Sequence, residues 1–267
     1  MNLDRWPHWV SDDGAITLIN ADCLALLSDM EACTVDALIT DPPYCSGGYM
    51  EAQKNTKAQG LRGATVSAED FKWFTSDNMG TSGLVWMLRE MMVQCHRILK
   101  PNRSAFVFTD WRMIPNVAPA LESGGMRYRN MIVWDKGNAG LGVGFKPAHE
   151  IIMEFCNGST EYQCKDGQNV LRSARLYGPA KVHGAQKPVE VIAELIRVST
   201  PIGGTVLDAF GGSGTTAVAA SGLGRRAMVC ERDPGYFEIA KTRIQKELDQ
   251  RNGTGPLIKA TLWEAAT

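Results

Sequence analysis

The stretch TVLDAFGGSGTT at residues 205–216 joins a short apolar strand to a glycine-rich turn and the start of a helix. Glycines let the backbone approach a ligand closely, and a helix N-terminus favours a negatively charged group. The segment also fits GxGxxA, the loose dinucleotide fingerprint, and Glu231 at the end of the next strand suits ribose hydroxyls. The segment therefore fits two interpretations at this point. It is the cofactor loop of a nicotinamide enzyme, or it is a turn that only packs a helix on a strand.

Strands and helices alternate along the rest of the chain. The predicted strands are seven short apolar runs at residues 15–19, 35–40, 105–109, 131–134, 151–155, 205–209 and 227–231. Helices are expected around residues 24–30, along the apolar stripe 84–98, from Pro188 to a stop at Pro201, and from about Tyr236. This order predicts an α/β fold of Rossmann-like type, with an open, seven-stranded, mostly parallel sheet that is covered on both faces.

Length and composition indicate one globular domain over residues 1–267, with 44% hydrophobic and 21% charged residues. No apolar run approaches the roughly 18 residues of a membrane helix, and the N-terminus lacks a signal-peptide pattern. The seven cysteines include no CxxC pair, so neither disulfides nor a zinc knuckle are expected. We therefore expect a cytoplasmic protein with no membrane segment and no metal.

Two long segments interrupt the alternation, an inserted loop at residues 46–83 and a basic segment at residues 157–186. Residues 97–187 hold 13 basic against 7 acidic side chains, whereas residues 1–96 hold 6 against 13. A locally basic surface can bind a polyanion although the net charge is −1. The loops predict binding elements near the working end of the sheet, and Lys165, Arg172, Arg175 and Lys181 are the candidate contacts to such a polyanion.

DPPY at residues 41–44 lies where an apolar strand ends. Two successive prolines fix the backbone and remove two donors, so the chain leaves the sheet in an extended turn. The turn exposes the Asp41 carboxylate, the Pro42 carbonyl and the Tyr44 ring at the edge where open α/β sheets bind ligands. A rigid exit turn with a packed tyrosine explains this motif alone equally well.

Together the two motifs resemble the DNA amino-methyltransferases that use S-adenosylmethionine, in the circularly permuted β arrangement where DPPY precedes the cofactor loop. RILKP at residues 97–101, IVWDK at 132–136 with His149-Glu150, and HGAQKP at 183–188 are similar to further elements of that family. The family element at 183–188 reads HPTQKP, so this chain lacks its threonine hydroxyl. The resemblance covers most of the chain.

The resemblance implies a set of site residues. Asp41, Pro42 and Tyr44 would be catalytic, with Asp41 and the Pro42 carbonyl accepting the amine hydrogens of a flipped-out base that stacks on Tyr44. The implied residues that bind S-adenosylmethionine are Asp22, Cys23, Lys187, Asp208, Phe210, Gly212, Ser213, Gly214, Thr215 and Glu231. A helix N-cap explains Asp22 equally well.

The resemblance implies adenine-N6 methylation of double-stranded DNA, because DPPY is associated with adenine more often than SPPY, which is commoner in cytosine-N4 enzymes. Cytosine-N4 methylation is the first alternative. A nicotinamide oxidoreductase and an inactive DNA-binding module are the others, and the oxidoreductase leaves DPPY unexplained. No proline precedes a cysteine, as cytosine-C5 methylation would need. A homodimer is expected, because a monomer of this size has little surface to grip both sides of a duplex.

Overall fold

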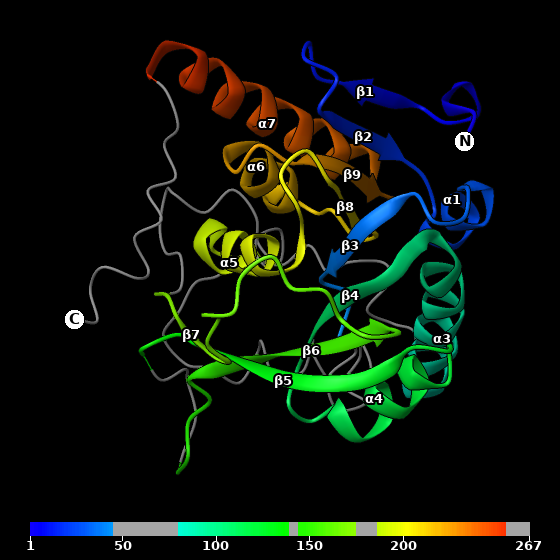
Figure 1. The fold of residues 1–267 in the computed structure, drawn as a ribbon, viewed down its shortest axis with the longest axis vertical. Coiled ribbons are helices and arrows are strands. Elements are labelled where there is room, and N and C mark those ends of the chain that lie inside the picture. Colours follow the sequence, from blue (N-terminus) through cyan, green and yellow to red (C-terminus); the bar gives the residue numbers. More distant parts are fainter. Residues whose placement is uncertain (45–79, 139–143, 175–185, 255–267) are drawn as a thin grey trace, which may run out of the picture.

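The computed structural model describes residues 1–44, 80–138, 144–174 and 186–254. These residues form one nine-stranded sheet in the order β1-β2-β9-β8-β3-β4-β6-β5-β7 (Figure 1). The strands are β1 His8–Val10, β2 Ile16–Asn20, β3 Val35–Thr40, β4 Leu99–Thr109, β5 Arg127–Asp135, β6 His149–Asn157, β7 Val170–Arg172, β8 Thr205–Asp208 and β9 Arg226–Glu231.

All seven predicted strands are present. The predicted number of strands is too low, because the sheet has two further strands at its edges, β1 and β7. β1 and β7 have three residues each, too few for an apolar pattern to show in the sequence. Strands β2, β9, β8, β3 and β4 are parallel, while β6 is antiparallel to both β4 and β5. The sheet is therefore mostly parallel, as predicted.

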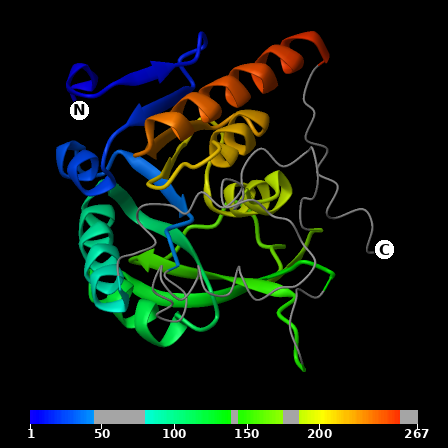
Figure 2. The same ribbon diagram turned by 180° about the vertical axis from the view of Figure 1, so that it is seen from behind.

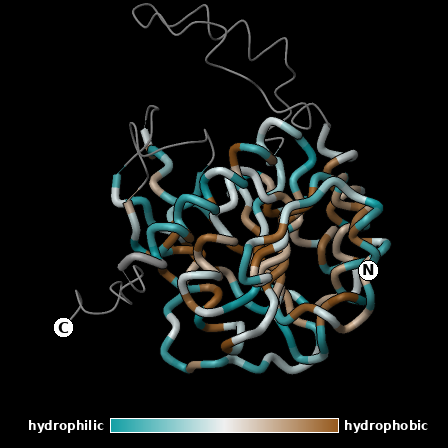
Figure 3. The backbone as a smooth tube through the Cα atoms, turned by 90° about the horizontal axis from the view of Figure 1, so that it is seen from above, coloured by the Kyte–Doolittle hydropathy of each residue, from teal (hydrophilic) through white to brown (hydrophobic). Residues whose placement is uncertain are grey.

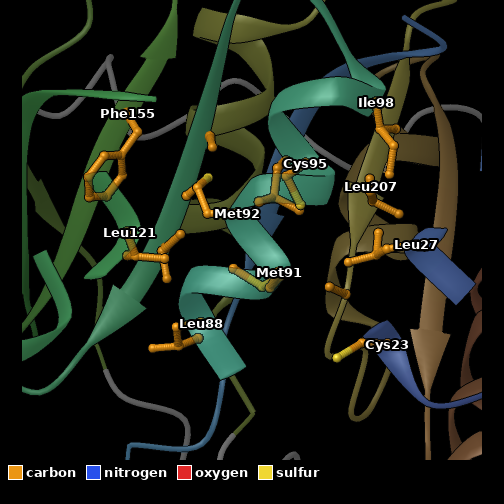
Figure 4. Close-up of a cluster of buried hydrophobic side chains, with 14 of the residues drawn as sticks. Cys23, Leu27, Leu88, Met91, Met92, Cys95, Ile98, Leu121, Phe155 and Leu207 are labelled. Atoms are coloured by element: carbon orange, nitrogen blue, oxygen red, sulfur yellow. The ribbon is translucent and has the colours of Figure 1, made fainter. Parts of the chain in front are cut away.

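Helices cover both faces of the sheet (Figures 1 and 2). They are α1 Cys23–Asp29, α3 Thr81–Ile98, α4 Ile114–Glu122, α5 Val189–Ser199, α6 Thr215–Gly222 and α7 Pro234–Thr254. Side chains of α1, α3 and α4 pack in one buried cluster (Figure 4), and those of α5, α6 and α7 pack in a second cluster. Figure 3 shows the hydrophobic segments gathered in the middle of the molecule, between the more hydrophilic outer segments.

Local sequence explains most helix boundaries. α3 ends at Ile98, before Pro101, as predicted. Pro188 is the N-cap of α5, with an extended ψ of 137°, and not its first helical residue. The sequence did not predict α4, because its two prolines are typical of helix breakers, although one of them lies in the first turn, where proline is tolerated. Within the described parts of the chain, no helix combines the length and apolar character needed to cross a membrane.

The helices that follow the neighbouring strands β8 and β3 lie on opposite faces of the sheet. The helix after β8 is α6, which packs on the second cluster, whereas the next helix described after β3 is α3, which packs on the first. In open α/β sheets such a switch leaves a crevice at the carboxyl ends of the two strands, where ligands bind. β3 ends at Thr40, directly before DPPY, and β8 ends at Asp208.

Candidate active site

Four predicted site carboxylates follow or end parallel strands. Asp22 follows β2, Asp41 follows β3, Asp208 ends β8 and Glu231 ends β9. Because these strands are parallel neighbours, all four residues lie at one edge of the sheet. The tertiary structure therefore brings the DPPY segment and the cofactor loop together across 168 residues of sequence.

The DPPY side chains are held by contacts to one another and to Lys187. Tyr44 Oη donates to Asp41 Oδ1 at 2.6 Å, and Lys187 Nζ donates to Asp41 Oδ2. Lys187 is buried, and its ammonium lies 5.4 Å from the centroids of the Tyr44 and Phe108 rings. The predicted cofactor residue Lys187 therefore contacts the predicted catalytic carboxylate directly.

A second carboxylate, Glu150, lies beside this group. Tyr44 Oη lies 3.2 Å and Lys187 Nζ 3.3 Å from its Oε2, and Lys136 Nζ donates to its Oε1 at 2.7 Å. Glu150 reaches the site because β6 runs against β4, which puts the first residues of β6 at the edge where the parallel strands end. Two carboxylates and two ammonium groups thus form one network.

Charges in this network shift each other's pKa values. Burial raises the pKa of Asp41, with Glu150 adding to the rise and Lys187 opposing it. Burial alone would also raise the pKa of Glu150, but Lys187 and Lys136 bring it below its usual value. The pKa of Lys187 is raised, because Asp41 and Glu150 outweigh the effect of burial. Lys187 is therefore charged at neutral pH.

Asp208 supports the cofactor loop through the hydrogen bonds that its carboxylate accepts. Its Oδ1 accepts from Thr40 Oγ1 at 2.9 Å and from the Phe210 amide at 3.1 Å, and its Oδ2 accepts from Thr216 Oγ1 at 2.6 Å. The side chain is buried, and burial raises its pKa to about 6. These contacts make Asp208 a support for the turn and not an exposed ligand.

The glycines of the turn have different surroundings. A Cβ on Gly211 would lie 2.2 Å from Val229 Cγ1, so this glycine is required for packing. Gly212 has a φ of +51°, and no atom lies within 4 Å of the position that its Cβ would take. Gly214, with a φ of +76°, is the N-cap of α6. Gly212 is therefore the point where the loop backbone borders open space.

Glu231 ends β9, the strand next to β8, and Asp22 follows β2, the strand beyond β9. Glu231 Oε2 accepts from the Gly212 amide and its Oε1 from the Asp233 amide, both at 2.7 Å. Asp22 is exposed and caps α1 through Leu24 and Ala25, so the N-cap explanation of this residue is confirmed. Cys23 is buried in the first cluster, and burial raises the pKa of its thiol to about 12, which keeps it protonated.

Ser213 and Thr215 of the loop are held by Arg243 of α7. Its Nη1 donates to the carbonyl and hydroxyl of Ser213 at 2.9 Å and to Thr215 Oγ1 at 3.0 Å. Phe210 is half-buried and packs against the first cluster. Ser213 and Thr215 are both buried, so Arg243 fixes the shape of the loop from the side of the protein interior.

The predicted DNA contacts are separated in the structure. Arg172 ends β7, paired with Asp135, at the same edge as the active site, and its side chain is 84% exposed. Lys165 instead lines a pocket of about 480 Å³ beside the sheet and α5, together with Glu154 and Tyr162. Arg175 and Lys181 lie outside the described residues, as does most of the loop 46–83; its last residues, from Thr81, begin α3.

Sequence reasoning gave no role to Lys136, Glu150, Thr40 or Arg243. Lys136 and Glu150 fall within segments that resemble the methyltransferase family, and this likeness was the only signal for them. Thr40 and Arg243 have no local signature. Their importance comes from hydrogen bonds to the cofactor loop, made by residues distant in sequence.

The residues present fit S-adenosylmethionine. The open space at Gly212 lets a ligand approach the loop backbone closely. A Cβ at this position would block that approach. The exposed carboxylate of Asp22 and the half-buried Glu231 provide acceptors for hydroxyl and amino groups of a nucleoside. Buried Lys187 provides a cation close to the Asp41 carboxylate.

Comparisons with known proteins agree with this site. A family model described as DNA methylase matches residues 35–242. The Type II methyltransferase M2.LlaDCHI of Lactococcus lactis subsp. cremoris is 28% identical over 253 residues, which covers 86% of this chain and 89% of that protein. The M1.HpyAVI–SAM complex superposes with a TM-score of 0.62 at 23% identity, covering 86% and 98% of the two chains. PvuII DNA methyltransferase (cytosine-N4-specific) gives 0.66 at 17% identity, covering 91% and 92%.

The family match includes both Asp41 and the cofactor loop, whereas the nicotinamide alternative explained the loop alone. The structural likenesses, at these identities, establish the class I methyltransferase fold. The order of motifs along the chain, with DPPY before the loop, makes it the circularly permuted form. The chain therefore belongs to the DNA methylase family, as an S-adenosylmethionine-dependent DNA amino-methyltransferase.

Proposed function

We propose that this enzyme methylates the N6 amino group of adenine at a specific site in double-stranded DNA. The observation that carries the proposal is the Asp41 carboxylate at the end of β3, beside Tyr44 and next to the cofactor strand β8. An exocyclic amine is a poor nucleophile, because its lone pair is delocalised into the ring. Catalysis must therefore localise that lone pair.

Asp41 and the Pro42 carbonyl would do this by accepting the two amine hydrogens. Two acceptors on one side favour a pyramidal nitrogen, whose lone pair then points away from them. Negative charge on Asp41 also stabilises the positive charge that grows on the nitrogen during transfer. S-adenosylmethionine supplies an activated methyl group on sulfur, so the protein contributes mainly position and electrostatics.

Tyr44 would stack on the adenine after the base has left the duplex. Its ring is held at one end by the contacts of Oη with Asp41 and Glu150. The loop at Phe210–Thr215, with Asp22, Glu231 and Lys187, would bind the cofactor. Its buried supports, Asp208 and Arg243, would keep the loop backbone in the binding conformation.

Cytosine-N4 methylation is the second candidate, and the likeness to the cytosine-N4-specific PvuII enzyme favours it. The two reactions share the same acceptor geometry, since both targets are exocyclic amines. The DPPY sequence favours adenine, and the segments 46–83 and 157–186 are proposed to select the site. Arg172, at the active-site edge, is the proposed DNA contact among the described residues.

Sequencing DNA from cells that express the chain, with modified bases identified, tests the proposal. N6-methyladenine at one recurring sequence is the expected result, and its absence from cells expressing Asp41→Ala is the control. N4-methylcytosine would select the second candidate. No modified base from either, with folded protein present, would contradict both and favour an inactive DNA-binding module.

Variants of Tyr44 separate stacking from hydrogen bonding. Tyr44→Phe keeps the ring and should retain much of the activity, whereas Tyr44→Ala should lose more. Methyl incorporation into DNA measures both. Equal losses in the two variants would show that the hydroxyl bonds to Asp41 and Glu150, and not the ring, carry the role of this residue.

We also propose that the enzyme acts as a cytoplasmic homodimer on duplex DNA. A single domain of 267 residues offers little surface to hold both sides of a duplex, so a second copy would complete the grip. Analytical ultracentrifugation with and without duplex DNA measures the stoichiometry. A complex of one chain per duplex at saturating protein would overturn the dimer.

A further inference from the structure

One buried ammonium group, that of Lys187, is shared between two carboxylates. It donates to Asp41 Oδ2 and lies 3.3 Å from Glu150 Oε2. Tyr44 Oη is shared in the same way, at 2.6 Å from Asp41 Oδ1 and 3.2 Å from Glu150 Oε2. The closer contacts of both groups are with Asp41.

This arrangement conflicts with the role of Asp41 in the proposed reaction. Asp41 must accept a hydrogen from the target amine, which then competes with Lys187 and Tyr44, the two groups that already donate to its oxygens. An ammonium beside the reacting nitrogen also opposes the positive charge that grows there. A shift of the Lys187 ammonium away from Asp41 would remove this opposition and free an acceptor site for the amine.

Lys187 cannot move into an apolar environment, because a buried charge without a partner is strongly unfavourable. Its side chain is 8% exposed, and Phe108 and Tyr44 border its ammonium. Among the described residues, Glu150 is the other carboxylate in contact with Lys187. Lys136, at 2.7 Å from Oε1, holds Glu150 in place from the opposite side.

We propose that Glu150 is a positioning residue, which receives the Lys187 ammonium and the Tyr44 hydroxyl when the target amine binds Asp41. Glu150 does not touch the base in this scheme. It acts through Lys187, by offering a second partner within reach of the same ammonium. The inference rests on the proposed amino-methyl transfer, since it is the substrate amine that competes with Lys187 for Asp41.

Glu150→Gln tests the proposal, because it keeps the shape of the side chain and removes the charge that attracts Lys187. The single-turnover rate of methyl transfer, measured with saturating S-adenosylmethionine and duplex DNA, should fall by about 10- to 100-fold, the range for a misplaced catalytic group. Binding of both ligands should change less than about threefold. Glu161→Gln is the matched control, since Glu161 is exposed, contacts Arg103 at 3.7 Å, and should keep the full rate.

The pH dependence of the methyl-transfer rate distinguishes this role from a purely structural one, because a purely structural role would not shift its acid limb. Asp41 faces Tyr44, Lys187 and Glu150, and interacts with Asp208 of β8, while Lys136 faces Glu150 from β5. Removing the Glu150 charge lowers the pKa of Asp41, since Glu150 raises it. The acid limb of the rate profile should therefore move to lower pH in Glu150→Gln, while the plateau falls.

A double variant tests the same point if Glu150→Gln alone does not fold. In Lys187→Met there is no ammonium to receive, so adding Glu150→Gln should change the remaining rate by less than about twofold. A further tenfold loss in the double variant would overturn the proposal, as would a wild-type rate in Glu150→Gln. A wild-type chain that transfers no methyl group to DNA would instead refute the proposed function itself.

Discussion

The hydroxyl of Thr40 donates to Oδ1 of Asp208 at 2.9 Å and joins the strand that leads into DPPY to the strand that leads into the cofactor loop. The Thr40 hydroxyl oxygen also accepts from the Ala209 amide at 3.2 Å. Both residues are buried, at the switch point between the two helix layers. One hydroxyl thus joins the strand that precedes DPPY to the strand that precedes the glycine-rich loop.

Thr40→Val should destabilise the protein, because it leaves the buried Asp208 carboxylate short of a donor at nearly constant side-chain volume. The expected loss in free energy of unfolding is about 1–3 kcal/mol. Urea unfolding measures it. Thr34→Val is the control, since that exposed hydroxyl donates only to the Glu31 carbonyl, and its loss should be below about 0.5 kcal/mol. Equal losses in the two variants would contradict the role of Thr40.

Asp208 should make stability depend on pH. Its pKa in the folded protein is raised to about 6 from 3.8, so the folded state holds the proton to higher pH than the unfolded state does. The stabilisation from this group is fully present below about pH 4 and is lost as the pH rises to about 6, a change of roughly 3 kcal/mol.

Asp208→Asn keeps an acceptor for the Phe210 amide and removes the titration. Urea midpoints of the two proteins between pH 4 and 7 provide the measurement, since contributions from all other groups are shared. The stability of wild type relative to the variant should decline over this interval. Parallel curves would mean that Asp208 does not titrate there.

The two glycines of the loop should separate binding from folding. Gly212→Ala adds a methyl group to open space beside the loop, so it should weaken S-adenosylmethionine binding, while its φ of +51° costs only about 1–2 kcal/mol of stability. Gly211→Ala places a Cβ 2.2 Å from Val229 Cγ1, so it should act mainly by destabilising the fold. Calorimetric titration and thermal unfolding of both variants test this, with NAD as the ligand expected not to bind. Unchanged affinity in Gly212→Ala would remove this loop from the cofactor site.

Arg172 and Lys165 should differ in DNA binding. Arg172→Ala removes an exposed cation at the active-site edge, and should weaken binding to every duplex and reduce the salt slope by about one unit if it contacts a phosphate. Lys165→Ala should leave both quantities unchanged, because Lys165 lines the pocket beside α5. Fluorescence anisotropy at several salt concentrations decides this. If the loss in Arg172→Ala is confined to one DNA sequence, by roughly 1–3 kcal/mol, the residue reads a base.

Local sequence patterns determined where the chain forms strands and where its two motifs lie. Apolar runs predicted all seven longer strands, and the prolines and glycines marked the turns at residues 41–44 and 211–214. These features depend on residues close in sequence, since hydrophobic period, backbone restriction and capping act within a few residues. The family likeness then connected the two motifs to one reaction.

The tertiary structure decided which side chains meet at the active site. Glu150 reaches Lys187 only because β6 runs antiparallel to β4, and strand direction is set by the packing of the whole sheet. Thr40 meets Asp208 because β3 and β8 are neighbours, although 168 residues separate them in the chain. Arg172 and Lys165 looked alike in the sequence, but one ends a strand at the active-site edge and the other lines a pocket. Such contacts join distant parts of the chain, so no local pattern encodes them.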